Sequence, residues 1–214
     1  RQRQMCIRDS YRAGFRLGFV SDTQDIWGKL RSRCENGISE DEMRFALDDF
    51  RGDIMQVPPM YSALKVNGQK LCDLARRGIE VERKPRPATI SRLELVSFDG
   101  TDGVLDVDCS GGTYIRTLLE DIAAAMGQKG TMSALRRTTA GVYTEADAHT
   151  LEEIQAAKDA GPEALQALML PVESVFESLP LLVAEPRVEQ HLYNGCPTSR
   201  YPAADGRYRV RSAA

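Results

Sequence analysis

The stretch from Leu105 to Gly127 constrains the fold most, because a strand pattern changes there into a helix pattern within a few residues. Leu105, Val107 and Cys109 alternate with polar residues, which is the period of a strand with one buried face. After a Gly-Gly pair, apolar residues recur at helical spacing, at Ile115, Leu118, Leu119, Ile122 and Met126. Such a strand and helix can bury both apolar faces only if the helix packs on the sheet. The pattern therefore predicts an α+β domain.

Two capping boxes predict where further helices begin. Ser39 is followed three residues later by Glu42, ahead of an amphipathic helix that ends near Gly52. Thr150 stands in the same relation to Glu153. In each pair the Ser or Thr side chain satisfies a free N–H of the first helical turn.

Alternating and β-rich segments predict strands at 11–19, 89–100, 103–111 and 133–144. Between the first two, Asn67-Gly68 marks a turn, and residues 70–78 form a short helix that a glycine stops. Beyond Leu179 the sequence shifts to Pro, Gly and short apolar runs, which predicts a small separate β module.

The composition excludes several classes of protein. The 214 residues carry a formal net charge of −3, which is unlike a generally basic nucleic-acid binder, although a local basic face remains compatible with it. Five cysteines without a C-x-x-C pair and only two histidines predict neither a disulfide framework nor a metal site. No apolar run is long enough to span a membrane and no signal peptide is recognisable, so we expect a soluble, cytoplasmic protein.

The first ten residues, RQRQMCIRDS, have no periodicity and no helix cap. Back-translation gives CGG CAG CGT CAG ATG TGT ATA AGA GAC AG, which resembles the mosaic-end adapter of a transposon-based sequencing library. We therefore expect residues 1–10 to be a non-native segment, to lie outside the fold, and to mark a gene cut before Tyr11.

Arg116 lies in the first turn of the helix that follows Gly111-Gly112, where the helix dipole is positive and a cation is unfavourable. One interpretation is a surface pair with Glu120, although the order of cation before anion is the weaker one. The other is a guanidinium turned inward to hold a carboxylate or phosphate. The residues alone leave both open. A Gly-Gly turn before a helix is only a weak indication of a phosphate site.

Several segments together resemble the TruB family of bacterial tRNA pseudouridine synthases. They are YRAGFRLGFVSDTQDIWG, FRGDIMQVPPMYSALKVNGQKLCDLARRGIEV, CSGGTYIRTLLEDIAAAMG and LRRTTAGVY. The resemblance implies a pseudouridine-synthase fold with a central antiparallel sheet, incomplete at its N-terminus, and a PUA-like C-terminal module. It implies three parts, namely 1–10 as the non-native segment, 11–176 as a partial catalytic domain with a thumb insertion at about 57–82, and 177–214 as a partial PUA-like module.

The resemblance also implies roles for particular residues. Tyr11 stacks against the target base, Tyr114 and Leu135 line the uridine pocket, and Arg116 pairs with the catalytic aspartate. In the family that aspartate lies in a G-x-x-D-P-x-A-x-G loop upstream of Tyr11. This sequence contains no such loop, and Asp9 is not assigned the role. We therefore expect Arg116 to lack its anion and the chain as written to be inactive.

By the same resemblance, the activity is isomerisation of uridine 55 in the tRNA T-loop to pseudouridine. The expected partner is the T-arm of tRNA, with no cofactor, metal or membrane, and the protein is expected to be a monomer. Basic residues at the end of the thumb are expected to bind RNA, namely Arg76, Arg77, Arg83 and Lys84. Two alternatives remain open, a non-catalytic RNA-binding protein on the same scaffold and an unrelated enzyme that binds phosphate at Gly111-Gly112.

Overall fold

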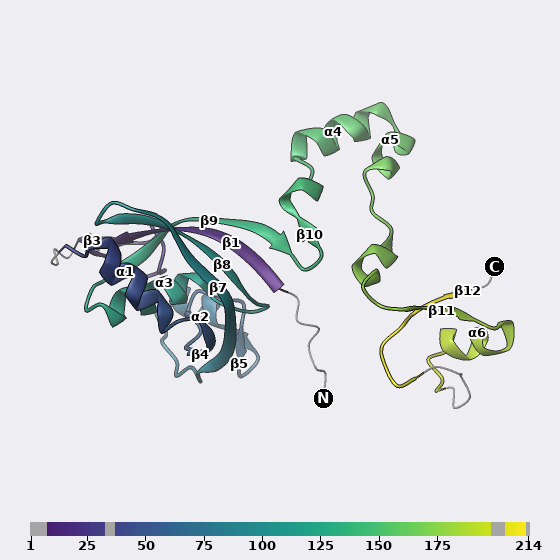
Figure 1. Ribbon diagram of the computed structural model, residues 1–214, viewed down its shortest axis with the longest axis horizontal. Coiled ribbons are helices and arrows are strands. Elements are labelled where there is room, and N and C mark those ends of the chain that lie inside the picture. Colours follow the sequence, from purple (N-terminus) through teal and green to yellow (C-terminus); the bar gives the residue numbers. More distant parts are fainter. Residues whose placement is uncertain (1–7, 33–36, 198–203, 213–214) are drawn as a thin grey trace. The chain divides into compact units, whose positions relative to one another are not determined.

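The computed structural model describes residues 8–32, 37–197 and 204–212 (Figure 1). The chain divides into two compact units, the first reaching Ala148 and the second beginning at His149. Within the described residues, no helix combines the length and apolar character needed to cross a membrane.

A six-stranded sheet forms the centre of the first unit, in the order β10-β9-β1-β8-β7-β4. Every pair of neighbouring strands is antiparallel, which confirms the predicted α+β class with a central antiparallel sheet. The strands are β1 (Arg8–Leu17), β4 (Gly52–Gln56), β7 (Arg86–Phe98), β8 (Asp102–Ser110), β9 (Gly130–Ala140) and β10 (Tyr143–Thr144).

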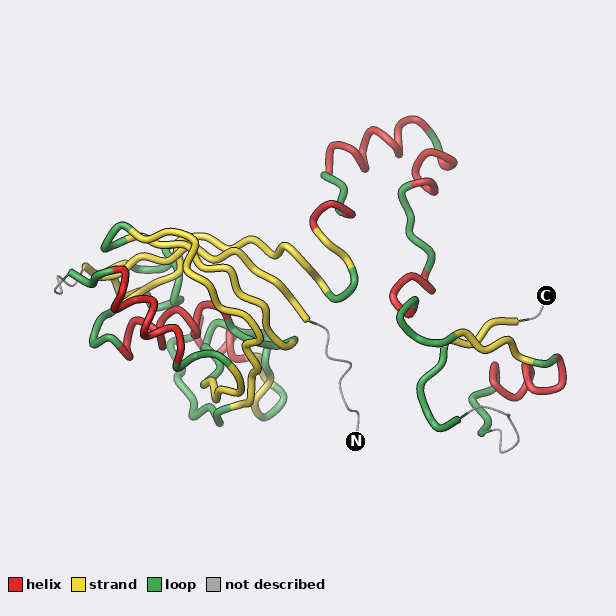
Figure 2. The backbone as a smooth tube through the Cα atoms, viewed as in Figure 1, coloured by secondary structure: helices red, strands yellow, loops and turns green. Residues whose placement is uncertain are grey.

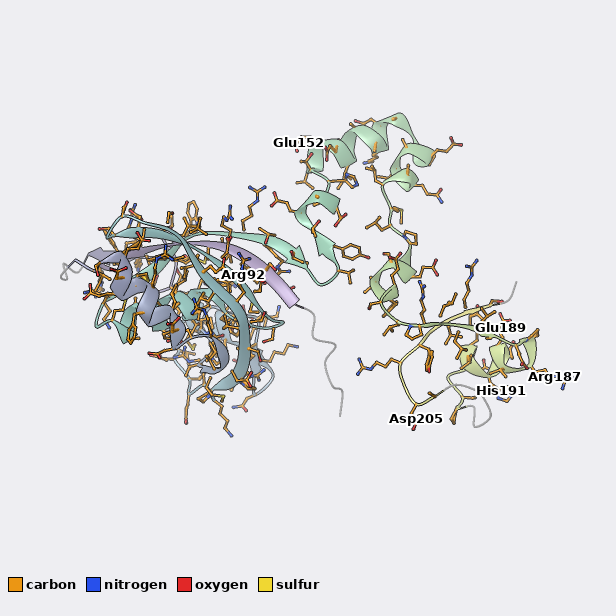
Figure 3. The ribbon with its side chains drawn as sticks, viewed as in Figure 1. Arg92, Glu152, Arg187, Glu189, His191 and Asp205 are labelled. Carbon is orange, nitrogen blue, oxygen red and sulfur yellow. The ribbon has the colours of Figure 1, made fainter. Side chains whose placement is uncertain are left out.

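Two helices, α1 (Glu40–Asp48) and α3 (Ile115–Ala125), cover one face of this sheet (Figure 2). The α3 residues Ile115, Leu118 and Ile122 pack into one cluster with Leu105 and Val107 of β8, as the sequence predicts. The capping box at the start of α1 is also confirmed. The other face of the sheet carries charged pairs that join neighbouring strands or residues of one strand, and Figure 3 labels one member, Arg92. They are Arg12–Asp106, Arg16–Asp102 and Arg92–Glu94.

Two small hairpins extend from the sheet. β2 (Phe19–Ser21) pairs with β3 (Leu30–Ser32), and β5 (Lys65–Val66) pairs with β6 (Gln69–Lys70). The turn of the second hairpin has positive φ at Asn67 and Gly68, which confirms the predicted turn. The short helix α2 (Leu71–Arg76) follows directly.

The first strand begins three residues earlier than predicted. Asp9 is paired with Cys109, and Arg8 with Ser110, so the ladder between β1 and β8 continues into residues that were expected to lie outside the fold. Residues 1–7, the rest of that segment, lie outside the described residues. At the other end Gly18, with φ of 78°, separates β1 from β2, so the expected single strand at 11–19 becomes two.

The second unit contains α4 (Leu151–Ala160), α5 (Pro162–Ala167), β11 (Leu181–Ala184), α6 (Pro186–Tyr193) and β12 (Arg209–Ser212). The capping box of Thr150 and Glu153 starts α4, as predicted. The last part of the chain is less purely β than expected, because an eight-residue helix separates its two parallel strands. Figure 3 labels two exposed side chains of this helix, Arg187 and His191. The PUA-like character of the predicted module at 177–214 stays a prediction.

Candidate functional site

The N-terminus of α3 is joined to the end of β4 through one buried side chain. Gln56 is 2% exposed, and its amide both accepts from the N–H of Tyr114 (3.0 Å) and donates to the carbonyl of Tyr114 (3.2 Å). Gly112, at φ of 87°, makes the tight turn that precedes Tyr114. Because Gln56 occupies the N–H of Tyr114, this amide is not available to a phosphate. Nothing in the sequence pattern indicated this role for Gln56.

Arg116 leaves the helix surface and joins three segments of the chain. Its Nη1 donates to the carbonyl of Thr23 (2.9 Å) and to Oδ2 of Asp25 (3.3 Å), and its Nη2 donates to the carbonyl of Tyr61 (2.8 Å). The side chains of Arg116 and Asp25 are 24% and 15% exposed. The guanidinium is therefore a partly buried link between α3, the turn after β2 and the segment after β4.

The structure places one anion beside Arg116 that the sequence analysis did not expect, namely Asp25. The pairing of Arg116 with the catalytic aspartate, which the family resemblance implies, stays a prediction. The surface pair with Glu120 is also not formed, because Glu120 instead accepts a hydrogen bond from Gln24. Glu120 meets Gln24 because residues 23–25 run alongside the first turns of α3. There the side-chain oxygen of Gln24 also accepts a hydrogen bond from the hydroxyl of Thr117 (3.2 Å).

Tyr11 lies on the helix-covered face of the sheet, opposite Val107 on one side and Arg137 on the other. It is 8% exposed, and the guanidinium carbon of Arg137 lies 5.2 Å from the centre of its ring. Burial raises the pKa of the Tyr11 hydroxyl, the carboxylate of Asp9 raises it further, and the charge of Arg137 opposes both. A base that stacked on this ring from the side of Arg137 would have to displace the guanidinium.

The strand register places another expected pocket residue near Tyr11. Leu135 is opposite Ala13 on β1, two residues along from Tyr11, and is 45% exposed. Tyr11 also shares its buried cluster with Ile115, which lies between Tyr114 and Arg116. Tyr11 and Leu135 therefore lie close together on the helix-covered face of β1 and β9, and Tyr114 and Arg116 lie at the beginning of α3.

Residues 4–115 match the TruB family pseudouridylate synthase (N terminal domain), and residues 116–177 match the tRNA pseudouridylate synthase B C-terminal domain. The chain belongs to the TruB family. It is 42% identical over 195 residues to the tRNA pseudouridine synthase B of Pseudomonas paraeruginosa, which covers 91% of this chain and 64% of that protein. The corresponding protein of Dechloromonas aromatica is 38% identical over 201 residues, 94% of this chain and 66% of that protein. The chain thus spans less than two thirds of the length of the first of these relatives.

Solved structures show the same fold. A Cbf5-Nop10-Gar1 complex matches with a TM-score of 0.65 at 24% identity, over 88% of this chain and 49% of the matched one. An H/ACA RNP bound to a substrate RNA containing 2'-deoxyuridine matches with a TM-score of 0.64 at 19% identity, over 96% of this chain and 56% of the matched one. At these identities the likeness concerns the fold alone.

The basic residues of the expected TruB thumb differ in their surroundings. Arg76 and Arg77 are exposed, although Arg76 pairs with Asp73 and Arg77 donates to Gln69. Lys84 is exposed too. Arg83 is only 22% exposed and donates to the carbonyl of Pro58 (3.2 Å) and to Glu80 (3.1 Å), so it links the two ends of the insertion. Three of these four cations are therefore exposed, and the fourth is held by hydrogen bonds within the insertion.

The side chains near the site give little support to two other kinds of chemistry, nucleophilic attack by a thiol and metal binding. The thiol of Cys109 is buried, which raises its pKa to about 11 and keeps it protonated, so it is a poor nucleophile. Among the described residues, no three His, Cys, Asp or Glu side chains gather closely enough to hold a metal ion.

Proposed function

We propose that this chain is part of an isomerase that converts uridine 55 of the tRNA T-loop to pseudouridine. The observation that carries the proposal is Arg116, a partly buried guanidinium in the first turn of the helix that follows Tyr114, in a chain of the TruB family. A uridine paired or stacked in RNA must turn out of its helix before a nucleophile can reach it. Tyr11, Tyr114 and Leu135 would then surround the turned-out base, since aromatic and apolar side chains replace the stacking that it loses.

Arg116 would hold the nucleophilic carboxylate of the complete enzyme. A guanidinium has five N–H donors, and described residues accept three hydrogen bonds from this one. The remaining donors suit a second carboxylate, which a fixed cation would keep ionised in a pocket from which water is excluded. Asp25, Thr23 and Tyr61 would orient the guanidinium while it does so.

The nucleophile itself is expected to come from a G-x-x-D-P-x-A-x-G loop that this sequence does not contain. We therefore propose that the chain as written binds tRNA through its T-arm and does not turn over, because positioned groups alone cannot form the covalent intermediate. Exposed cations of the thumb would contribute binding by contacting phosphates.

The test is to incubate the chain with unmodified tRNA and to map pseudouridine by carbodiimide labelling and primer extension. We expect RNA binding without conversion. A second form, extended upstream with the codons that precede Tyr11 in the source gene, should convert the T-loop uridine if those codons encode the aspartate loop. Conversion by the chain as written would refute the proposed division of roles. An upstream region without such a loop would favour the alternative, a non-catalytic RNA-binding protein.

A further inference from the structure

The turn between β2 and β3 is held by hydrogen bonds from its own side chains. Oδ1 of Asp25 accepts from the hydroxyl of Thr23 (2.7 Å) and from the backbone N–H of Trp27 (3.1 Å). Oδ1 of Asp22 accepts from the backbone N–H of Lys29 (2.9 Å). The backbone on both sides of the Trp27 side chain is therefore fixed.

The same turn is attached to the central sheet. The N–H of Ile26 donates to the carbonyl of Met132 on β9 (2.9 Å), and the N–H of Met132 donates to the carbonyl of Gln24 (3.0 Å). Gly28 closes the turn so tightly that a Cβ at this position would collide with the side chains of the residues that begin it. A rigid support of this kind is what a preorganised binding residue requires.

This rigid turn presents its one large aromatic side chain to solvent. Trp27 is the only tryptophan of the 214 residues and is 86% exposed. Lys29 and Arg31, which follow it, are exposed, and neither forms an ion pair within the part of the chain that the structure describes. The nearby carboxylates of Asp22 and Asp25 already accept hydrogen bonds from the turn. The surface around Trp27 therefore combines an exposed aromatic ring with two exposed cations, and Asp22 is an exposed anion of the same turn.

An exposed indole with two neighbouring cations suits single-stranded RNA. Bases stack on aromatic side chains, and the phosphates between them attract Lys and Arg. The location agrees, because Thr23 and Asp25 of the same turn hold Arg116. We propose that Trp27 is a stacking platform for an unpaired base of the substrate RNA, next to the target uridine, while Lys29 and Arg31 contact the adjoining phosphates. The inference rests on the RNA function proposed above.

The tryptophan provides its own test. The full chain is titrated with a fluorescein-labelled T-arm hairpin RNA, and binding is measured by anisotropy. A parallel titration with unlabelled hairpin follows the emission of Trp27. We expect the emission to be quenched in step with binding, and Trp27→Ala to weaken binding about ten-fold. Trp27→Phe should retain most of the affinity, since a phenyl ring also stacks. Thermal unfolding should be unchanged in both variants, because the side chain is outside the core.

A double variant, Trp27→Phe with Phe45→Trp, serves as the matched control. It moves the fluorophore to a side chain of α1 that is 77% exposed and has Asp41 and Glu42 nearby, where RNA should not bind. Equal quenching in this control would overturn the inference. Hairpin binding with unchanged Trp27 emission and undiminished affinity of Trp27→Ala would overturn the inference alone and leave the RNA function standing. No binding of the hairpin at low salt would overturn both.

Discussion

Replacing Arg116 with Met is expected to destabilise the first unit of the protein. The change removes three hydrogen bonds and leaves Asp25, whose side chain is only 15% exposed, without its cation. A hydrogen bond to a charged group contributes about 1.5–3 kcal/mol, and removing one partner of a fully buried pair costs about 3–5 kcal/mol. Since the Arg116 side chain is 24% exposed, water can reach part of the site. We therefore expect a loss of about 2–3 kcal/mol, below the fully buried range.

The assay is unfolding in urea, followed by far-UV circular dichroism, with thermal unfolding alongside. The expected loss corresponds to a fall in Tm of about 5–10 °C. Arg116→Lys keeps the charge, but one ammonium cannot reach acceptors on both sides of the guanidinium, so it should lose about half as much. The matched control is Arg76→Met, which breaks an ion pair whose side chains are 70% and 54% exposed. That change should alter stability by less than about 0.5 kcal/mol.

The result that would refute the reasoning is equal unfolding midpoints for Arg116→Met and Arg76→Met. It would mean that the three hydrogen bonds of Arg116 add nothing to the folded state beyond what a surface pair adds. A double-mutant cycle with Asp25→Asn then separates the carboxylate from the two carbonyls. We expect a coupling energy of about 1 kcal/mol between Arg116 and Asp25.

Two further predictions concern other groups. Replacing Arg76, Arg77 and Lys84 with Gln should weaken tRNA binding. It should also reduce the slope of log affinity against log salt by about one unit for every phosphate that the protein no longer neutralises. An unchanged slope would mean that these three side chains face solvent and do not contact phosphates. Burial, with a smaller contribution from Glu120, raises the pKa of Asp121 to about 6. The folded state thus holds this proton more tightly than the unfolded state, so the contribution of Asp121 to stability is fully present below about pH 4 and is lost as the pH rises through about 6. In urea unfolding, the free energy of unfolding of Asp121→Asn should match that of the parent at low pH and exceed it by about 1 kcal/mol at pH 8. A difference that is the same at every pH would contradict the raised pKa of Asp121.

Local patterns in the sequence were enough to predict much of the first unit. The alternation in β8 and the helical spacing in α3 involve neighbours in the chain, and the same residues are buried in the structure, apart from the partly buried Met126. Both helix capping boxes are likewise local, since each joins residues three positions apart. The motif resemblance added the family, and the family matches over 4–115 and 116–177 confirm it.

The partners of the site residues could not be predicted in this way. Arg116 bonds to residues 93, 91 and 55 positions away, and Gln56 reaches Tyr114 across 58 positions. Which atoms meet over such separations depends on where turns end and on strand register. The bulge between Ile90 and Arg92, for example, changes which positions of β7 face the core.

The sequence by itself therefore determined the class of fold and most of its elements, and the site residues that it suggested stay a prediction. Only the tertiary structure decided that Asp25 pairs with Arg116, that Arg83 donates to the carbonyl of Pro58, and that Trp27 is presented to solvent. The physical reason is that burial patterns and caps act within a few residues, whereas a long-range hydrogen bond has no local energetic signature until the chain has folded.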